Sequence, residues 1–277
     1  MTSMAQVDYF AYGWVTPVLA YLFSFLGSLL ALKATARARM LPSGKEKARW
    51  LILAAWALGG TGIWVMHFLA MIGFQVPGSQ VRFDLALTVA SWLIAVLVVG
   101  IGLFIVGYGR RSYPKIIIAG LLTGCGVAAM HYTGMAAMHI DGTTHYDMQY
   151  VDASVVIAVV AATVALWFTV TISHTAVIVV AAAIMGIAVT GMHYTGMVAL
   201  KVAPAAHSAS VTGGVSPFTL LVPIFIFALL VVIALGYAML NSLNERDARA
   251  LDELQARLRE PASGNAAPRT GFTPTAH

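Results

Sequence analysis

The chain has 277 residues, of which 60% are hydrophobic and only 10% are charged, and its formal net charge is +5. Soluble globular domains carry about 25% charged residues, so this composition excludes a soluble protein and indicates an integral membrane protein. The positive charge does not call for nucleic acid as a partner, because it follows the membrane topology described below.

Seven apolar stretches are long enough to cross a bilayer, which takes about 20 residues in a helix. The sequence lacks the short segments of alternating polarity that are typical of outer-membrane barrels. We therefore predict an all-α, polytopic membrane protein with seven transmembrane helices. Their expected bounds are 12–32, 50–73, 85–107, 115–139, 152–172, 176–200 and 217–240.

The basic residues predict the orientation of these helices. Of the 16 Lys and Arg, all but Arg82 and Lys201 fall in the first loop, the third loop or the C-terminal segment. These three regions lie on one side of the membrane, and loops rich in Lys and Arg stay in the cytoplasm. We expect the N-terminus outside and the C-terminus in the cytoplasm.

A short motif recurs near the ends of the second, fourth and sixth predicted helices. The copies align on His67, His131 and His193, which are 64 and 62 residues apart. Methionine comes directly before each histidine and again four residues after it, and glycine lies seven residues before it. The methionines are Met66, Met130, Met192, Met71, Met135 and Met197, and the glycines are Gly60, Gly124 and Gly186. This indicates three tandem two-helix repeats followed by a seventh helix.

Helices of even number run in the same direction, so the three motifs lie on the same side of the membrane. Each histidine falls roughly 10–15 Å below the outer boundary, at about 1.5 Å per helical residue. We expect the three imidazoles to converge near the outer leaflet. In the second copy the helical face of His131 is predicted to continue to Met138 and His139, two candidate accessory ligands.

Imidazole and thioether groups form a soft, uncharged ligand set. Mg²⁺ and Ca²⁺ prefer carboxylates, and structural zinc more often recruits thiolates. The three histidines and six methionines therefore favour copper, one or two ions, as Cu(I) or Cu(II). Reduced copper can also take up a small diatomic ligand. The neighbouring hydroxyls either orient the imidazoles from behind or bond to helix backbone; they are those of Tyr132, Tyr194, Thr133 and Thr195.

The repeated Met-His-Tyr-Thr signature over about residues 10–240 resembles the MHYT family of bacterial integral membrane sensor domains. The resemblance implies a sensor in the bacterial cytoplasmic (inner) membrane that binds copper and, through it, oxygen, carbon monoxide or nitric oxide. The first copy departs from the signature, with Phe68, Leu69 and Ala70 in place of Tyr, Thr and Gly. The ligating residue types are kept in all three copies.

Three segments are predicted along the chain: a membrane sensor domain at 1–240, a cytoplasmic amphipathic helix at 241–260 and a disordered tail at 261–277. Leucines at roughly helical spacing mark the second segment, which could also pair two copies into a homodimer. They are Leu243, Leu251, Leu254 and Leu258. We expect no enzymatic activity in this chain, and an output through a separate cytoplasmic protein or a downstream module.

Two other functions compete with this interpretation. Two of the three histidines could hold a haem iron, as in a membrane oxidoreductase. Alternatively, the motifs could serve copper transport. A transport path needs polar groups across the whole membrane, and the cytoplasmic halves of the predicted helices contain almost none.

Overall fold

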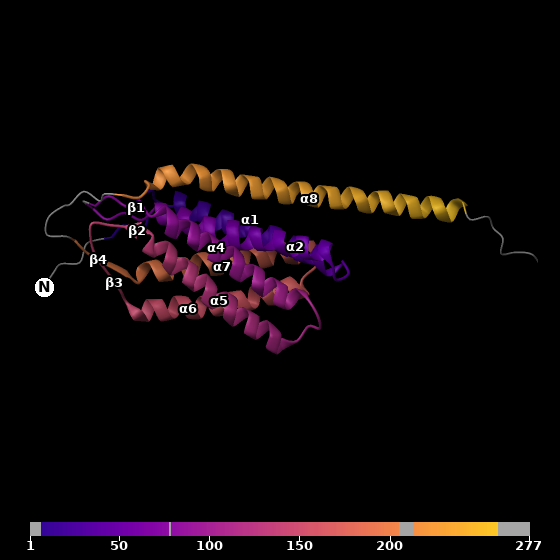
Figure 1. The fold of residues 1–277 in the computed structure, drawn as a ribbon, viewed down its shortest axis with the longest axis horizontal. Coiled ribbons are helices and arrows are strands. Elements are labelled where there is room, and N and C mark those ends of the chain that lie inside the picture. Colours follow the sequence, from indigo (N-terminus) through magenta and orange to yellow (C-terminus); the bar gives the residue numbers. More distant parts are fainter. Residues whose placement is uncertain (1–6, 78, 205–212, 260–277) are drawn as a thin grey trace, which may run out of the picture. The chain divides into compact units, whose positions relative to one another are not determined.

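The structure, a computed structural model, describes residues 7–77, 79–204 and 213–259. The chain divides into two units, Met1–Leu235 and Gly236–His277, and the bundle described below belongs to the first. The described residues are helical apart from four short strands (Figure 1). Seven helices are long and apolar enough to cross a membrane, which confirms the predicted fold class.

Most ends of the seven spans lie within four residues of the predicted bounds, but the first span ends at Arg39 instead of 32 and the second begins at Lys45 instead of 50, because both helices continue into the basic, polar end of the bundle. The second span is one continuous helix, Lys45–Ile72, in which α2 (Lys45–Ala55) and α3 (Met66–Ile72) flank a π-helical stretch, η1 (Trp56–Val65). The other helices are α1 (Val15–Arg39), α4 (Leu85–Gly107), α5 (Tyr113–Ala136), α6 (Met148–Thr171), α7 (Thr175–Val198) and α8 (Pro217–Arg259). The π-helix is specific to the first repeat and was not predicted; such stretches occur often at functional sites.

Two helices begin at aspartates that satisfy free backbone N–H groups. The Asp84 carboxylate accepts from the Leu87 N–H at 2.8 Å, and the Asp147 carboxylate accepts from the Gln149 N–H at 3.1 Å. Asp, Asn, Ser and Thr are preferred at this position because a helix leaves its first N–H groups unpaired. Local sequence therefore sets where α4 and α6 begin.

The six helices before α8 form a closed ring. In order, α1, the second span, α4, α5, α6 and α7 each contact the next, and α7 contacts α1 again. The motif-bearing helices α3, α5 and α7 also contact one another. So do the first helices of the three pairs, α1, α4 and α6. This arrangement brings equivalent positions of the three repeats together.

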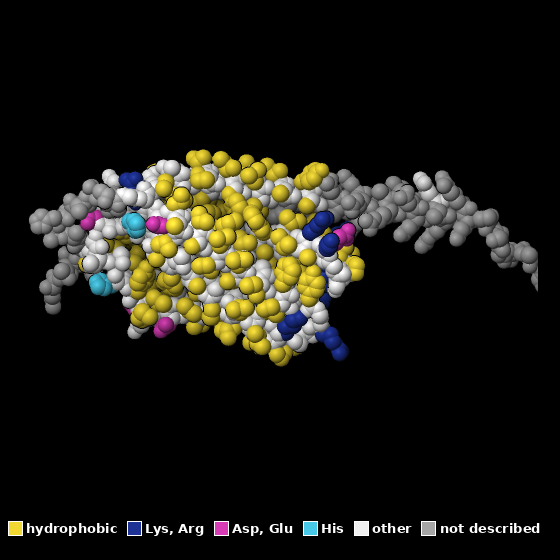
Figure 2. Space-filling model, viewed as in Figure 1, with side chains coloured by type: hydrophobic (Ala, Val, Ile, Leu, Met, Phe, Trp, Pro, Cys, Tyr) yellow, Lys and Arg dark blue, Asp and Glu magenta, His cyan; other side chains and the backbone are white. Residues whose placement is uncertain are grey.

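The bundle surface separates an apolar middle from a basic end. Figure 2 shows a broad hydrophobic band with Lys and Arg gathered at one end and Asp and His towards the other. Exposed leucine and valine side chains fill the band, as a lipid-facing surface requires. We call the end with the Lys and Arg residues the basic end. It comprises the end of α1, the start of α2, the α4–α5 loop and the start of α5, with Arg37, Arg39, Lys45, Lys47, Arg49, Arg110, Arg111 and Lys115.

Short antiparallel strands join the loops at the opposite end. Strand β1 (Arg82–Phe83) pairs with β2 (Met138–His139), and β3 (Gly142–Tyr146) pairs with β4 (Leu200–Pro204). The prediction that the α5 face continues to Met138 and His139 is wrong, because α5 ends at Ala136 and Met138 pairs with Phe83 instead. Their accessory role thereby loses its geometric basis.

Helix α8 has the bounds Pro217–Arg259, so the backbone of the predicted 241–260 segment is helical up to Arg259. The side chains of Leu243, Leu251, Leu254 and Leu258, and the whole of residues 261–277, lie outside the described part of the chain. The division into three segments, the pairing of copies and the disordered tail stay predictions.

Candidate metal centre

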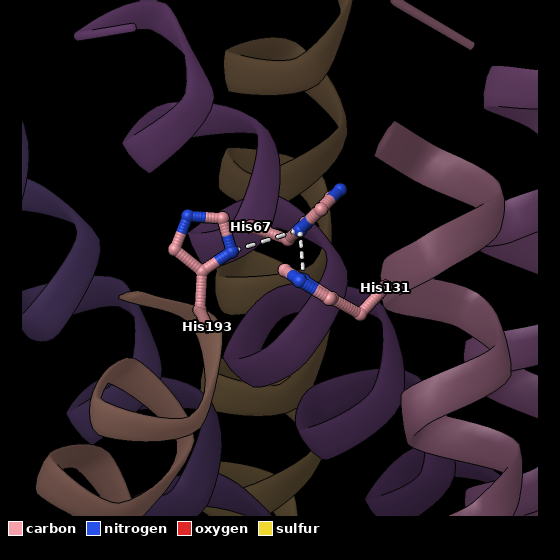
Figure 3. Close-up of side chains that lie close together, drawn as sticks. All are labelled: His67, His131 and His193. Atoms are coloured by element: carbon pink, nitrogen blue, oxygen red, sulfur yellow. Dashed lines mark hydrogen bonds between the residues drawn. The ribbon is translucent and has the colours of Figure 1, made fainter. Parts of the chain in front are cut away.

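Three helices of the ring bring one histidine each to a common point. His67 lies on α3, His131 on α5 and His193 on α7, and each is five residues before its helix ends. Equal distances from parallel helix ends place the imidazoles at one depth. All three side chains are at most 1% exposed. The rings point towards one another (Figure 3), which confirms the predicted convergence.

The nitrogen atoms that meet are the Nδ1 atoms. His67 Nδ1 lies 2.9 Å from His193 Nδ1 and 3.2 Å from His131 Nδ1. The three potential ligand atoms lie within 4.8 Å of one another, and the ring centroids are 4.9–5.1 Å apart. Without an ion, an Nδ1–H of one ring donates to the Nδ1 of its neighbour, so the arrangement depends on which nitrogens carry protons.

This geometry fits a single metal ion. Nitrogen ligands about 2.0–2.1 Å from one ion, in trigonal or tetrahedral arrangement, lie roughly 3.3–3.6 Å from one another. The two Nδ1 separations that involve His67, 2.9 and 3.2 Å, would need to widen by only a few tenths of an ångström, and the ligand atoms of His131 and His193 lie within 4.8 Å of each other. Among the described residues, these histidines are the one group of three or more His, Cys, Asp or Glu side chains close enough to hold a metal ion.

All three outer ring nitrogens are buried, and two of them lie against glycine. Each of the three Nε2 atoms is buried without a hydrogen-bond partner. A Cβ atom at Gly134 would lie 2.2 Å from Nε2 of His67, and one at Gly196 would lie 2.3 Å from Nε2 of His131. Each of these two rings therefore occupies the space that a missing side chain leaves in the next repeat.

These two glycines are site residues that the sequence interpretation missed. Gly134 and Gly196 come three residues after His131 and His193, where the first copy has Ala70. The repeated glycine was visible as a signal, but its contact is with the histidine of the preceding copy. A buried polar atom without a partner costs about 1–3 kcal/mol, and natural proteins retain such atoms mainly where function requires them.

All six predicted methionine ligands are buried. The exposed fraction of each is at most 2%. Met192 and Met185 help to line an apolar cavity of about 40 Å³ that also borders small side chains such as Ala158, Ala162 and Ala188. Coordination by the methionines stays a prediction. The candidate accessory residue Met138 is also buried, whereas His139 is exposed on β2.

The tyrosines of the second and third copies lie beside the histidines without hydrogen bonding to them. The rings of Tyr132 and His131 meet edge-on at 4.9 Å, and those of Tyr194 and His193 at 5.1 Å. The Tyr132 hydroxyl is 2.7 Å from the Ser154 hydroxyl on α6, and the Tyr194 hydroxyl is buried without a partner. The Tyr132 hydroxyl thus ties α5 to α6.

The motif threonines are Thr133 on α5 and Thr195 on α7. The Thr195 hydroxyl donates to the Gly191 carbonyl of its own helix at 2.8 Å, as expected for a threonine that bonds to helix backbone. Thr133 is half-buried. Support of the imidazoles by these residues stays a prediction.

Substituting the two tyrosines with phenylalanine tests whether their hydroxyls join neighbouring helices or support the histidines. Tyr132→Phe should lower the free energy of unfolding by about 1 kcal/mol, because it removes the hydrogen bond between Tyr132 and Ser154 that joins α5 to α6, while the Ser154 hydroxyl keeps its bond to the Val151 carbonyl. Tyr194→Phe removes a hydroxyl that has no hydrogen-bond partner and should cost less. Thermal unfolding of both variants, with metal content measured alongside, checks this. A loss of metal in Tyr132→Phe would show instead that its hydroxyl supports the site.

The repeats match a known family model over most of the chain. The model, described as "Bacterial signalling protein N terminal repeat" and named MHYT, matches residues 60–119, 124–184 and 186–254. Each match begins at the glycine seven residues before a motif histidine. The chain belongs to the MHYT family. The resemblance inferred from the motifs is thus confirmed, and this is an integral membrane protein of bacterial signalling type.

Curated relatives of this MHYT chain are signalling proteins. It is 35% identical over 238 residues to the bifunctional diguanylate cyclase/cyclic di-GMP phosphodiesterase MucR of Pseudomonas aeruginosa, covering 84% of this chain and 34% of MucR. It is 34% identical to the cyclic di-GMP phosphodiesterase NbdA of the same organism, over 66% of this chain and 24% of NbdA. It is 27% identical to the signaling protein YkoW of Bacillus subtilis, over 65% and 23%.

The MHYT chain spans about a third or less of the length of these relatives. It therefore corresponds to their sensor part. No solved structure matches the chain.

Proposed function

We propose that this MHYT chain is a membrane sensor that binds copper through His67, His131 and His193. The observation that carries the proposal is the meeting of three buried imidazoles, one from each repeat, whose ligand atoms all lie within 4.8 Å of one another, with His67 Nδ1 2.9 and 3.2 Å from the other two Nδ1 atoms. Polar groups inside a membrane protein are costly and usually functional. Three of them at one point, with their outer nitrogens unpartnered, support a ligand-binding role.

The donor chemistry favours copper over other ions. The described group contains three imidazoles, with no carboxylate or thiolate among them. Such a site suits copper, and three histidine ligands with an open position also suit zinc. The buried methionines that flank each histidine favour the softer ion, Cu(I). One ion fits the triad; a second would have to recruit the methionines.

The signal we propose is a diatomic gas (oxygen, carbon monoxide or nitric oxide) or the redox or copper status at the outer leaflet. A copper ion held by three ligands would supply an open position for a small molecule. The protein's part is to hold α3, α5 and α7 together through their histidines and to exclude water. Ligand binding or a redox change at the copper would alter how these helices pack against one another. The seventh span would then transmit this change to the cytoplasm.

The basic end supports a cytoplasmic position for that part of the bundle, with the N-terminus outside, in the bacterial inner membrane. Its relatives MucR and NbdA are named as cyclic di-GMP enzymes. We propose that this chain likewise controls a cytoplasmic output, carried by a separate protein or by a downstream module. No enzymatic activity is proposed for the sensor itself.

The geometry of the triad disfavours the haem alternative. A porphyrin needs a flat space between its two axial ligands, whereas here the third imidazole lies at the same point as the other two. Copper transport finds little support in the bundle, because the cavity next to Met192 is lined almost entirely by apolar side chains.

Metal analysis of histidine variants tests the proposal. The full chain, purified from copper-supplemented cells, should contain about one copper per chain, and His131→Ala should reduce this to background. The control is His145→Ala, which removes an exposed histidine on β3. Full metal content in His131→Ala would refute the triad as the site. Stoichiometric zinc would refute copper, and a Soret band would restore haem.

A further inference from the structure

A second polar site lies at the basic end of the bundle, far along the helices from the histidines. A cavity of about 200 Å³ opens where α1, α2, α4 and α6 meet. Its basic lining comes from three different segments: Arg39 on α1, Lys47 on α2 and Arg111 in the loop before α5. Thr35 and Thr169 add hydroxyls to the same wall.

The three cations are held around the cavity without acidic partners. The Arg39 guanidinium donates to the carbonyls of Thr169 and Ile172 at the end of α6. The Lys47 ammonium lies 5.1 Å from the centre of the Tyr108 ring. No carboxylate pairs with either side chain or with Arg111 among the described residues.

Acidic residues are scarce around the site. Glu46, exposed on α2, is the one acidic residue at this end among described residues of the bundle. The other acidic side chains of that part lie at or near the opposite helix ends; they are Asp8, Asp84, Asp141, Asp147 and Asp152. The three cations therefore concentrate positive potential in a partly enclosed space, which favours the binding of an anion.

A second cavity adjoins the first and reaches towards the lipid. It also has a volume of about 200 Å³, and it shares Arg111 and Val170 with the first. Tyr113 and Trp167 line it and are 77% and 44% exposed. Exposed Tyr and Trp are enriched at the depth of lipid headgroups. Arg111 thus stands between a polar cavity inside the bundle and an aromatic-lined opening at the membrane interface.

We propose that these adjoining cavities bind a phosphate-bearing anion, with Arg39, Lys47 and Arg111 as its recognition groups. Arginine forms paired hydrogen bonds with phosphate, and lysine supplies a point charge. Basic pockets between transmembrane helices on the cytoplasmic side bind the headgroups of anionic lipids. The same chemistry would accept a soluble phosphate, and the two sources are separated by the probes below. This site is independent of the proposed copper centre.

Charge-matched substitutions test the proposal on the full chain in a neutral detergent. The test variant is Lys47→Gln with Arg111→Gln, and the control is Lys45→Gln with Arg110→Gln. The control removes two exposed cations of the same segments that do not line either cavity. Each protein is titrated with cardiolipin and, separately, with sodium phosphate at constant ionic strength, and the shift of unfolding temperature gives the apparent affinity.

We expect the wild-type chain and the control to bind with affinities within about twofold, and the test variant to bind about 25-fold more weakly, at roughly fivefold per charge. A response to cardiolipin alone identifies a lipid as the source, and a response to sodium phosphate alone identifies a soluble anion. Equal loss in test and control variants, or no shift of the wild type with either probe, would overturn the proposal.

Two further measurements keep the result interpretable. Copper content should be the same in all variants, which separates this site from the histidine triad. Should the double variant fail to fold, Arg111→Gln alone is compared with Arg110→Gln. Both arginines are exposed, and Arg111 makes no hydrogen bond or ion pair with the described residues.

Discussion

Replacing Gly134 with Ala should displace the imidazole of His67 and weaken copper binding by at least tenfold. The new Cβ would lie 2.2 Å from Nε2 of His67, far inside van der Waals contact. The ring cannot retreat inwards, because its Nδ1 already lies 2.9 Å from His193 and 3.2 Å from His131. Either the ring turns away or α5 moves outwards, and both separate the ligand atoms.

Gly196→Ala should have the same effect through His131, whose Nε2 would lie 2.3 Å from the new Cβ. Overpacking of this kind typically also costs about 1–3 kcal/mol of stability. Copper content by elemental analysis and thermal unfolding measure the two effects on the same samples.

The matched control is Gly191→Ala, two residues before His193 on α7. A Cβ there has no other atom within 4 Å, and Ala is favoured over Gly inside a helix by up to about 1 kcal/mol. This variant should keep its copper and its stability. Full copper in Gly134→Ala and Gly196→Ala would contradict the packing of the imidazoles against the next repeat. Equal losses in all three variants would point to a general intolerance of substitution.

Gly27→Ala should destabilise the whole bundle more than any change on its lipid-facing surface. A Cβ at Gly27 of α1 would lie 2.4 Å from the backbone nitrogen of Gly62 and 2.5 Å from the carbonyl oxygen of Ala57. Both atoms belong to the π-helical backbone, which cannot rotate away as a side chain can. Small residues permit such approaches between membrane helices. We expect a loss of about 3 kcal/mol or more.

The control for this prediction is Gly100→Ala on α4. Its nearest neighbour would be the Cβ of Ala55 at 3.5 Å, an ordinary contact. Unfolding in a series of denaturing detergent mixtures should show a large loss for Gly27→Ala and little change for Gly100→Ala. Similar stability of the two variants would mean that α1 and η1 do not approach as closely as described.

Several features of this protein could be predicted from the sequence because each depends on local pattern. Apolar length identified the seven spans, and the observed helices begin and end within a few residues of the predicted bounds at most termini. Even numbering of the motif helices, with one histidine per copy at matching places, predicted that His67, His131 and His193 would meet. The copper, the methionine ligands and the orientation rest on chemistry and composition and stay proposals.

The sequence interpretation was wrong about the end of α5 and did not predict the strand pairing that follows it. Both depend on where the chain leaves its helices. The face of His131 was extended to Met138 and His139, but α5 ends at Ala136 and the chain turns into a strand. This strand, β2, pairs with β1, so the pairing joins segments more than 50 residues apart in sequence. Hydropathy does not register such contacts, since an apolar residue fits both a helix end and a buried strand.

The sequence by itself determined the class of this protein and its threefold repeat, because hydropathy and repeat spacing act along the chain. It overestimated the distance from each histidine to its helix end, which is five residues, because the helix ends depend on the loops and strands that follow. Only the tertiary structure decided that Nδ1 atoms meet at the centre, that Gly134 and Gly196 receive the outer edges of two rings, and that Arg39, Lys47 and Arg111 surround one cavity. These depend on how each helix is rotated about its own axis. That rotation is set by contacts between repeats, which a single helix sequence does not contain.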